Sequence, residues 1–194
     1  NGEELYDIQA DPGQDENVAE SNPDVVSRMQ AHYAGWWEGV KDTYDTYQRI
    51  RIGSREENPI RLCSADWAWV YADNPKNIRG GVMDSGTWHV DVVESGRYTL
   101  TLRRWPEESG LGIAAPAPVL EGVDGTLMEG KAFPVASAWV NAGGREATRD
   151  IPEGATEVTF EADLERGPAQ IKSWWYEGDG NRLAGAYYLT AERH

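Results

Sequence analysis

Residues 88–106 have the sequence WHVDVVESGRYTLTLRRWP, and this stretch decides the fold class. Apolar and polar residues alternate from Trp88 to Val92 and again from Tyr98 to Leu102, which is the two-residue period of a strand with one buried face. Ser95-Gly96 lies between the two runs and favours a turn, so we expect adjacent strands of a hairpin. Pro106 ends the second run, because proline has no N–H to donate to a strand ladder.

The same period recurs along most of the remaining chain. Residues 158–164 alternate, and residues 169–176 and 184–192 flank a glycine-rich turn at 178–181, which predicts a C-terminal hairpin. Three weaker candidates, which bring the total to about eight strands, are residues 59–64, 67–71 and 132–140. Because short runs are joined by turns rather than by helices, residues 49–194 are predicted to form an antiparallel β-sandwich domain.

Residues 1–48 have a different pattern and are predicted to be a separate region. A short strand at 3–8 precedes a helix that begins at Pro23, with Asn22 as its N-cap. Apolar residues then recur in steps of three and four as far as Tyr47, which predicts about six or seven turns. We expect this helix to pack on one face of the sandwich. The chain opens on Asn1 with a strand already under way, which indicates a fragment of a longer protein.

The composition excludes several classes of partner and site. Lysine and arginine number 18 against 33 aspartates and glutamates, giving a net charge of −15. Nucleic acid and anionic membrane surfaces are therefore not expected as partners, because binding to them needs clustered cations. No apolar run approaches the ~18 residues that span a bilayer. The single cysteine, Cys63, allows neither an internal disulfide nor a multi-cysteine zinc site.

No residue is predicted to be catalytic or to bind a metal. Cys63 has no histidine near it in sequence, and His32, His89 and His194 fall in three different elements. Acidic and amide residues cluster with glycine at three places, but none has the spacing of a calcium loop, and we favour turns there. The three places are Asp73-Asn74, Asp124-Gly125 and residues 178–181.

Arg103, Arg104 and Trp105 form the candidate binding site. Since Pro106 ends the strand, two guanidiniums and an indole are expected together at its tip. Such a group suits a sulfated or carboxylated sugar, through bidentate hydrogen bonds and stacking. The alternative is that the arginines pair with some of the excess acids and bridge two domains.

Aromatic residues are unusually frequent and leave a second function open. The chain has nine tryptophans and nine tyrosines, and consecutive aromatics at 174–176 must point to opposite faces of a sheet. One interpretation is that these rings fill the core and a seam with another domain. The alternative is a carbohydrate-binding β-sandwich whose exposed rings stack on sugars. The tryptophans of the β region are Trp67, Trp69, Trp88, Trp105, Trp139, Trp174 and Trp175.

Several motifs resemble those of a known family. The sequence ELYDI at 4–8, followed by Asp11-Pro12-Gly13-Gln14 and a helix that contains Trp36-Trp37, is similar to the closing segment of arylsulfatase-type sulfatases. Later pieces are similar to the C-terminal extension of bacterial sulfatases. These are residues 65–67, 86–88, 96–98, 102–107 and 185–188.

The resemblance implies a non-catalytic C-terminal segment of a secreted or periplasmic sulfatase. The parent enzyme would hydrolyse sulfate esters with a formylglycine and calcium, and its catalytic domain would be the partner of this segment. No cofactor is expected in this chain, since the residues after Cys63 lack the arginine of the formylglycine signature. In this interpretation the role is structural, and Arg103, Arg104 and Trp105 border the substrate cleft.

Overall fold

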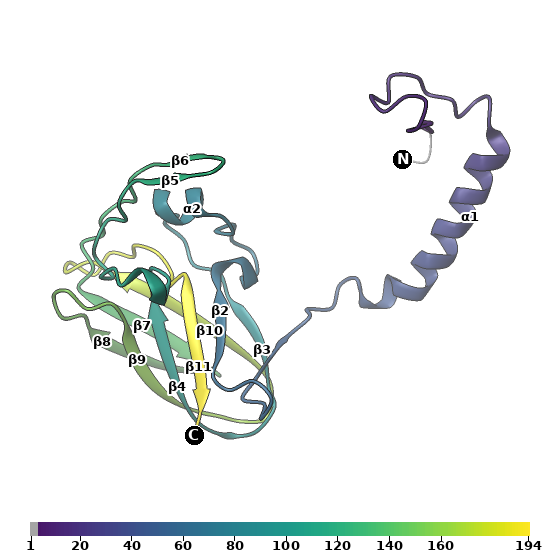
Figure 1. The fold of residues 1–194 in the computed structure, drawn as a ribbon. Coiled ribbons are helices and arrows are strands. Elements are labelled where there is room, and N and C mark those ends of the chain that lie inside the picture. Colours follow the sequence, from purple (N-terminus) through teal and green to yellow (C-terminus); the bar gives the residue numbers. More distant parts are fainter. Residues whose placement is uncertain (1–3) are drawn as a thin grey trace. The chain divides into compact units, whose positions relative to one another are not determined.

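The computed structural model describes residues 4–194 (Figure 1). The chain divides into two compact units, Asn1–Tyr47 and Gln48–His194. The first unit contains the helix α1, Pro23–Val40, and the 3-10 turn η1, Lys41–Thr43. The second contains all the strands. Among the described helices, none is both long and apolar enough to cross a membrane.

The helix α1 begins where the sequence predicts but ends earlier. Pro23 occupies its first turn, while the Asn22 side chain donates to the Val18 carbonyl (2.9 Å) and caps no helical N–H. The helix ends at Val40, two turns before Tyr47. Residues 4–8 form no strand and instead close a loop, in which the Val18 N–H donates to the Leu5 carbonyl (2.8 Å). None of the α1 residues is buried, and its packing on the sandwich stays a prediction.

The larger sheet of the second unit has the strand order β1-β3-β10-β7-β8. β3 and β7 alternate in burial, whereas β10 buries three consecutive residues at 173–175 and all six residues of the edge strand β8 are exposed. All neighbouring pairs are antiparallel except β1 with β3, which is parallel. The five strands are β1 Ile50–Ile52, β3 Trp88–Val92, β7 Ser137–Ala142, β8 Arg145–Asp150 and β10 Gly167–Tyr176.

The smaller sheet has the order β2-β11-β4-β9 and is antiparallel throughout. Its strands are β2 Ile60–Cys63, β4 Gly96–Arg103, β9 Val158–Leu164 and β11 Tyr188–Arg193. The connections hold the remaining elements: η2 Ser64–Asp66, α2 Pro75–Gly80, η3 Glu107–Ser109, and the hairpin of β5 Leu120–Gly122 with β6 Gly125–Leu127.

The two sheets share one hydrophobic core. The inward residues of β3, β4 and β10 are almost completely buried, including Trp88, Leu100 and Trp175. These side chains come from both sheets, so the second unit is a β-sandwich. The predicted fold class, mainly β with an N-terminal helix, is confirmed, with eleven strands in the described residues where the pattern predicts about eight.

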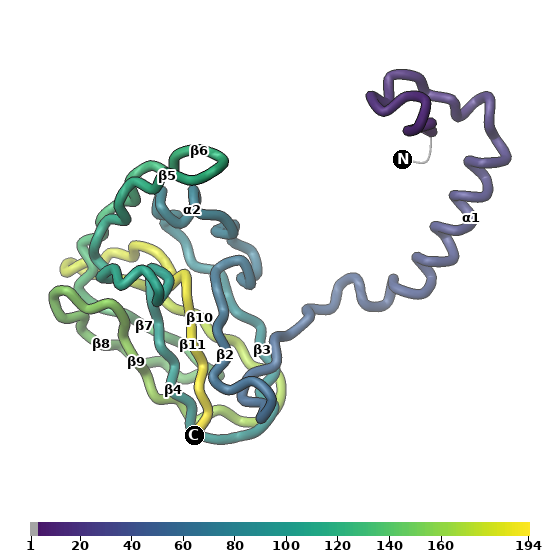
Figure 2. Tube along the Cα trace, viewed as in Figure 1, coloured from purple at the N-terminus to yellow at the C-terminus, as the bar shows by residue number. Residues whose placement is uncertain are grey.

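Both predicted hairpins are wrong. β3 and β4 lie in different sheets, and so do β10 and β11, so each connection carries the chain from one sheet to the other (Figure 2). Near the C-terminus only residues 182–184 turn back on the end of β10, where the Leu183 N–H donates to the Trp175 carbonyl (2.9 Å). Alternation reveals which face of a strand is buried, but it does not reveal which strand lies beside it.

Candidate aromatic binding site

The loop between β2 and α2, residues 64–74, holds the candidate site. Its two ends are joined by the buried Ser64 hydroxyl, which donates to the Ala72 carbonyl. The Asp66 carboxylate accepts the Cys63 N–H (2.9 Å), and the Asn74 side chain accepts the Asn77 N–H (3.0 Å) at the start of α2. These bonds fix both ends of the loop, at residues 63–66 and at residues 72–74.

Trp67 anchors the loop in the core. Only 7% of its surface is exposed, and its ring contacts Trp88 and Tyr187 at centroid distances of 5.5 and 5.8 Å. Gly86 lets this ring approach, since a Cβ there would lie 2.4 Å from the Trp67 Cβ. The Ala68 N–H then donates to the Thr87 carbonyl (3.0 Å), which ties the loop to the residues before β3.

Beyond Ala68 the chain turns its aromatic rings outward. Trp69 adopts a φ of 76°, which is in the left-handed region that non-glycine residues rarely occupy. Its side chain is 84% exposed and that of Tyr71 is 82% exposed. The two rings border a hollow of about 420 Å³, which we call the aromatic hollow. It is lined by Ser64, Ala65, Trp67, Trp69, Val70, Tyr71 and Asp73.

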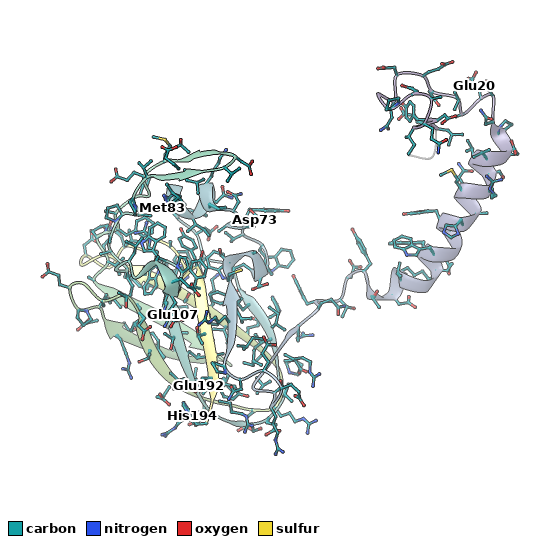
Figure 3. All side chains as sticks on the ribbon, viewed as in Figure 1. Glu20, Asp73, Met83, Glu107, Glu192 and His194 are labelled. Carbon is teal, nitrogen blue, oxygen red and sulfur yellow. The ribbon has the colours of Figure 1, made fainter. Side chains whose placement is uncertain are left out.

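The aromatic hollow offers stacking surface and one exposed carboxylate, that of Asp73. Asp73 is exposed, and Figure 3 shows it at the end of the sandwich opposite to Glu192 and His194. The Trp67 indole N–H is buried and has no hydrogen-bond partner among the described residues. Across residues 4–194, no group of three acidic, histidine or cysteine side chains is arranged to hold a metal ion. The arrangement can therefore bind a ligand that has both apolar faces and hydroxyl groups.

Comparisons with known proteins give structural neighbours only. No family model matches the chain, and no curated protein matches it. Among solved structures, it is similar to a family 35 carbohydrate-binding module from Clostridium thermocellum, at 17% identity and a TM-score of 0.37. That match covers 71% of this chain and 100% of the module.

Two glycoside hydrolases are also similar in structure. A ruminal GH26 endo-β-1,4-mannanase matches 73% of this chain at 14% identity and a TM-score of 0.38, and an exo-β-1,3-galactanase from Phanerochaete chrysosporium matches 70% at 12% identity and a TM-score of 0.38. The chain spans 27% of the first enzyme and 29% of the second.

These neighbours correct the predicted family. The resemblance predicts an arylsulfatase-type segment with a sulfatase catalytic domain as partner, whereas the similar structures are carbohydrate-binding modules and glycoside hydrolases. Several motifs behind that prediction have packing roles: Trp67, Trp88 and Tyr98 are core residues. Gly185 lies against Ser85, where a Cβ would come within 2.6 Å of the Ser85 hydroxyl oxygen. Such residues are required by the sandwich itself, so they do not identify an enzyme family.

The sequence-predicted residues Arg104 and Trp105 lie inside the protein. Arg104 is fully buried, with its guanidinium carbon 3.6 Å from the centre of the Phe133 ring and 4.5 Å from that of Trp105. It donates to the carbonyls of Ile113 (3.3 Å), Ala115 (3.4 Å) and Lys131. Burial lowers the pKa of Arg104 to about 10, still well above neutral pH. The expectation that this guanidinium lies exposed at a strand tip is wrong.

Arg103 is paired with acids instead of lying open. Its guanidinium contacts the carboxylates of Glu157 and, at 3.8 Å, Glu107, and it donates to the Thr190 hydroxyl (3.3 Å). Only 12% of the side chain is exposed. β4 ends at Arg103, three residues before Pro106, and residues 107–136 then fold back over Arg104 and Trp105. The structure does not bring the three residues together as a surface site.

Sequence reasoning missed the exposed pair Trp69 and Tyr71. In a regular strand, Trp67, Trp69 and Tyr71 would all lie on one face. The positive φ of Trp69 breaks that alternation, so Trp67 points into the core while the other two are exposed. The only signal in the sequence is three aromatics within five residues that precede the turn residues Asp73-Asn74-Pro75.

Proposed function

We propose that residues 48–194 are a carbohydrate-binding module whose ligand stacks on Trp69 and Tyr71. The observation that carries this proposal is a pair of aromatic rings, 84% and 82% exposed, beside a hollow of about 420 Å³. Exposed apolar side chains that lie together, rather than scattered singly, often mark a binding site. A flat ring covers the apolar face of a pyranose, while hydroxyl groups reach side chains such as that of Asp73.

The backbone of the loop supports a binding role. A left-handed non-glycine residue costs about 1 kcal/mol or more and persists where its surroundings fix it, often at a functional site. Here the Ala68 bond to Thr87 and the Ser64 bond to Ala72 hold both sides of Trp69. The ring is therefore presented in place before a ligand arrives, which lowers the entropic cost of binding.

The lining of the aromatic hollow favours binding over hydrolysis. Glycosidases use two carboxyl groups placed across the scissile bond. Among the residues that line this hollow, Asp73 is the sole carboxylate, and neither histidine nor cysteine lines it. A ligand in this hollow meets no nucleophile with a base beside it.

Tyr71→Ala is expected to weaken binding about tenfold, equivalent to ~1.4 kcal/mol, because it removes one stacking surface. The measurement is a titration of the full chain with soluble plant and microbial polysaccharides, followed by tryptophan fluorescence and by retardation in polysaccharide-containing gels. Tyr44→Ala is the matched control, since Tyr44 is 74% exposed but lies in the first unit. Equal affinities of Tyr71→Ala and wild type, or no retardation of wild type by any polysaccharide, would contradict the proposal.

A further inference from the structure

A second hollow of about 380 Å³ adjoins the aromatic hollow. The two share three lining residues, Ser64, Ala65 and Asp73, so they lie on either side of a common wall. We call the second one the hairpin hollow, because Leu120 of β5 and Leu127 of β6 line it. These two leucines are register partners in the hairpin.

Arg79 of α2 holds the hairpin in place. Its Nε donates to the Met128 carbonyl (2.9 Å) and its Nη2 donates to the Pro118 carbonyl, so it bonds both ends of the β5–β6 hairpin. The Lys131 N–H donates in return to the Arg79 carbonyl (2.9 Å). In Figure 1 the hairpin and α2 lie at the same end of the sandwich. The hairpin is therefore a fixed wall of the second hollow and not a loose loop.

The lining of the hairpin hollow combines apolar surface with hydrogen-bonding groups. Ile78, Trp105 and the two leucines supply apolar surface. Within the described residues, the Arg79 Nη1 and the Tyr188 hydroxyl make no hydrogen bond. Apolar walls with a few available polar groups match the ring faces and hydroxyl groups of sugar units.

Charge favours a neutral ligand. The shared wall carries the carboxylate of Asp73, and residues 48–194 hold 22 acidic against 16 basic residues, a net charge of 16 − 22 = −6, so both disfavour an anion. The Arg79 guanidinium already donates to two backbone carbonyls. A neutral sugar can form hydrogen bonds with the Arg79 Nη1 and the Tyr188 hydroxyl without electrostatic repulsion from the acidic side chains.

We infer that the two hollows together bind one linear, neutral oligosaccharide, with one part stacked on Trp69 and Tyr71 and the following part in the hairpin hollow. This inference rests on the proposed function. It implies that the module prefers longer chains, because a short sugar on the aromatic pair does not reach the second hollow. It also makes Tyr188 and the hairpin leucines contacts for the later units.

The test is a titration of the full chain with an oligosaccharide ladder, from one to six units, of the neutral polysaccharide that it binds best. We expect affinity to rise about tenfold or more between the shortest bound member and the longer ones, and then to level off. Leu120→Asp, at a residue 55% exposed, is expected to remove this rise and leave the shortest bound member unaffected. Val123→Asp is the matched control, since Val123 is fully exposed on the same hairpin and does not line the hollow.

Tyr188→Phe and Cys63 provide two further readouts. Tyr188→Phe keeps the ring and removes the hydroxyl, so we expect a loss of about threefold or more for long chains only. Cys63, the single cysteine, also lines the hairpin hollow, and burial raises the pKa of its thiol. At alkaline pH, long oligosaccharides are expected to slow its alkylation by iodoacetamide, whereas short ones are not.

The outcomes separate this inference from the proposed function. The extended site is overturned if every member of the ladder binds equally, if Leu120→Asp has no effect, and if Cys63 is not protected from alkylation. That result would still be consistent with the proposed carbohydrate-binding function. If no member binds, or if binding is indifferent to Tyr71→Ala, the proposed function fails and this inference fails with it. A preference for uronate or sulfated chains over neutral chains of the same length would also overturn the inference.

Discussion

Arg104→Ala is expected to destabilise the second unit by about 3 kcal/mol or more. The wild-type guanidinium is fully buried between Phe133 and Trp105 and donates to three backbone carbonyls. Each buried acceptor that loses its donor costs about 1–3 kcal/mol, and the truncation also leaves a cavity. Denaturant unfolding of wild type and variant, followed by tryptophan fluorescence, gives the difference in free energy of unfolding.

The control for this prediction is Arg61→Ala. The Arg61 side chain is 63% exposed and contacts the exposed carboxylates of Glu107 and Glu108 at 2.9 Å. Exposed ion pairs contribute little, so its loss is expected to change stability by less than about 1 kcal/mol. Equal effects of the two substitutions would mean that Arg104 does not hold residues 107–136 over the sandwich.

Trp69→Gly is expected to weaken carbohydrate binding about thirtyfold or more without a comparable loss of stability. The ring supplies one of the two stacking surfaces, and removal of a tryptophan at the centre of a binding surface typically costs about 2 kcal/mol or more. Glycine, however, adopts a positive φ freely, so the backbone strain at this position is relieved. We expect the free energy of unfolding to stay within about 1 kcal/mol of wild type.

The paired measurements are a polysaccharide titration and denaturant unfolding of the same protein preparation. Trp36→Gly is not a suitable control, because a glycine within α1 would itself destabilise the helix. Tyr44→Ala, outside the helix, serves for both measurements. If Trp69→Gly unfolds much more readily than wild type, the backbone at this position is not strained. If it binds as well as wild type, the Trp69 ring does not contact the ligand.

The sequence predicts the strands whose burial alternates and little about their neighbours. Residues 88–92 and 158–164 coincide with β3 and β9, because each places apolar side chains on one face only. β8 has no such signal, since all six of its residues are exposed at a sheet edge. The sheet to which β4 and β11 belong depends on contacts across the whole domain, which local periodicity does not encode.

The candidate site illustrates the same limit. Sequence reasoning selects Arg103-Arg104-Trp105 because charge and aromaticity occur together before a proline, but the segment that follows, residues 107–136, folds back and covers Arg104 and Trp105. The exposed rings of Trp69 and Tyr71 depend on one left-handed residue. The composition shows that aromatic residues are abundant, which allows a carbohydrate-binding interpretation. Which of the rings face solvent depends on the backbone conformation, and the sequence alone does not reveal it.

A crystal structure of this chain with a bound neutral oligosaccharide would show directly where the sugar lies. We expect a sugar ring stacked on Trp69 or Tyr71 and the following units toward Leu120, Leu127 and Tyr188. Ligand density on the outer face of the larger sheet, near Trp139 and Trp174, with none beside Trp69 and Tyr71, would contradict it.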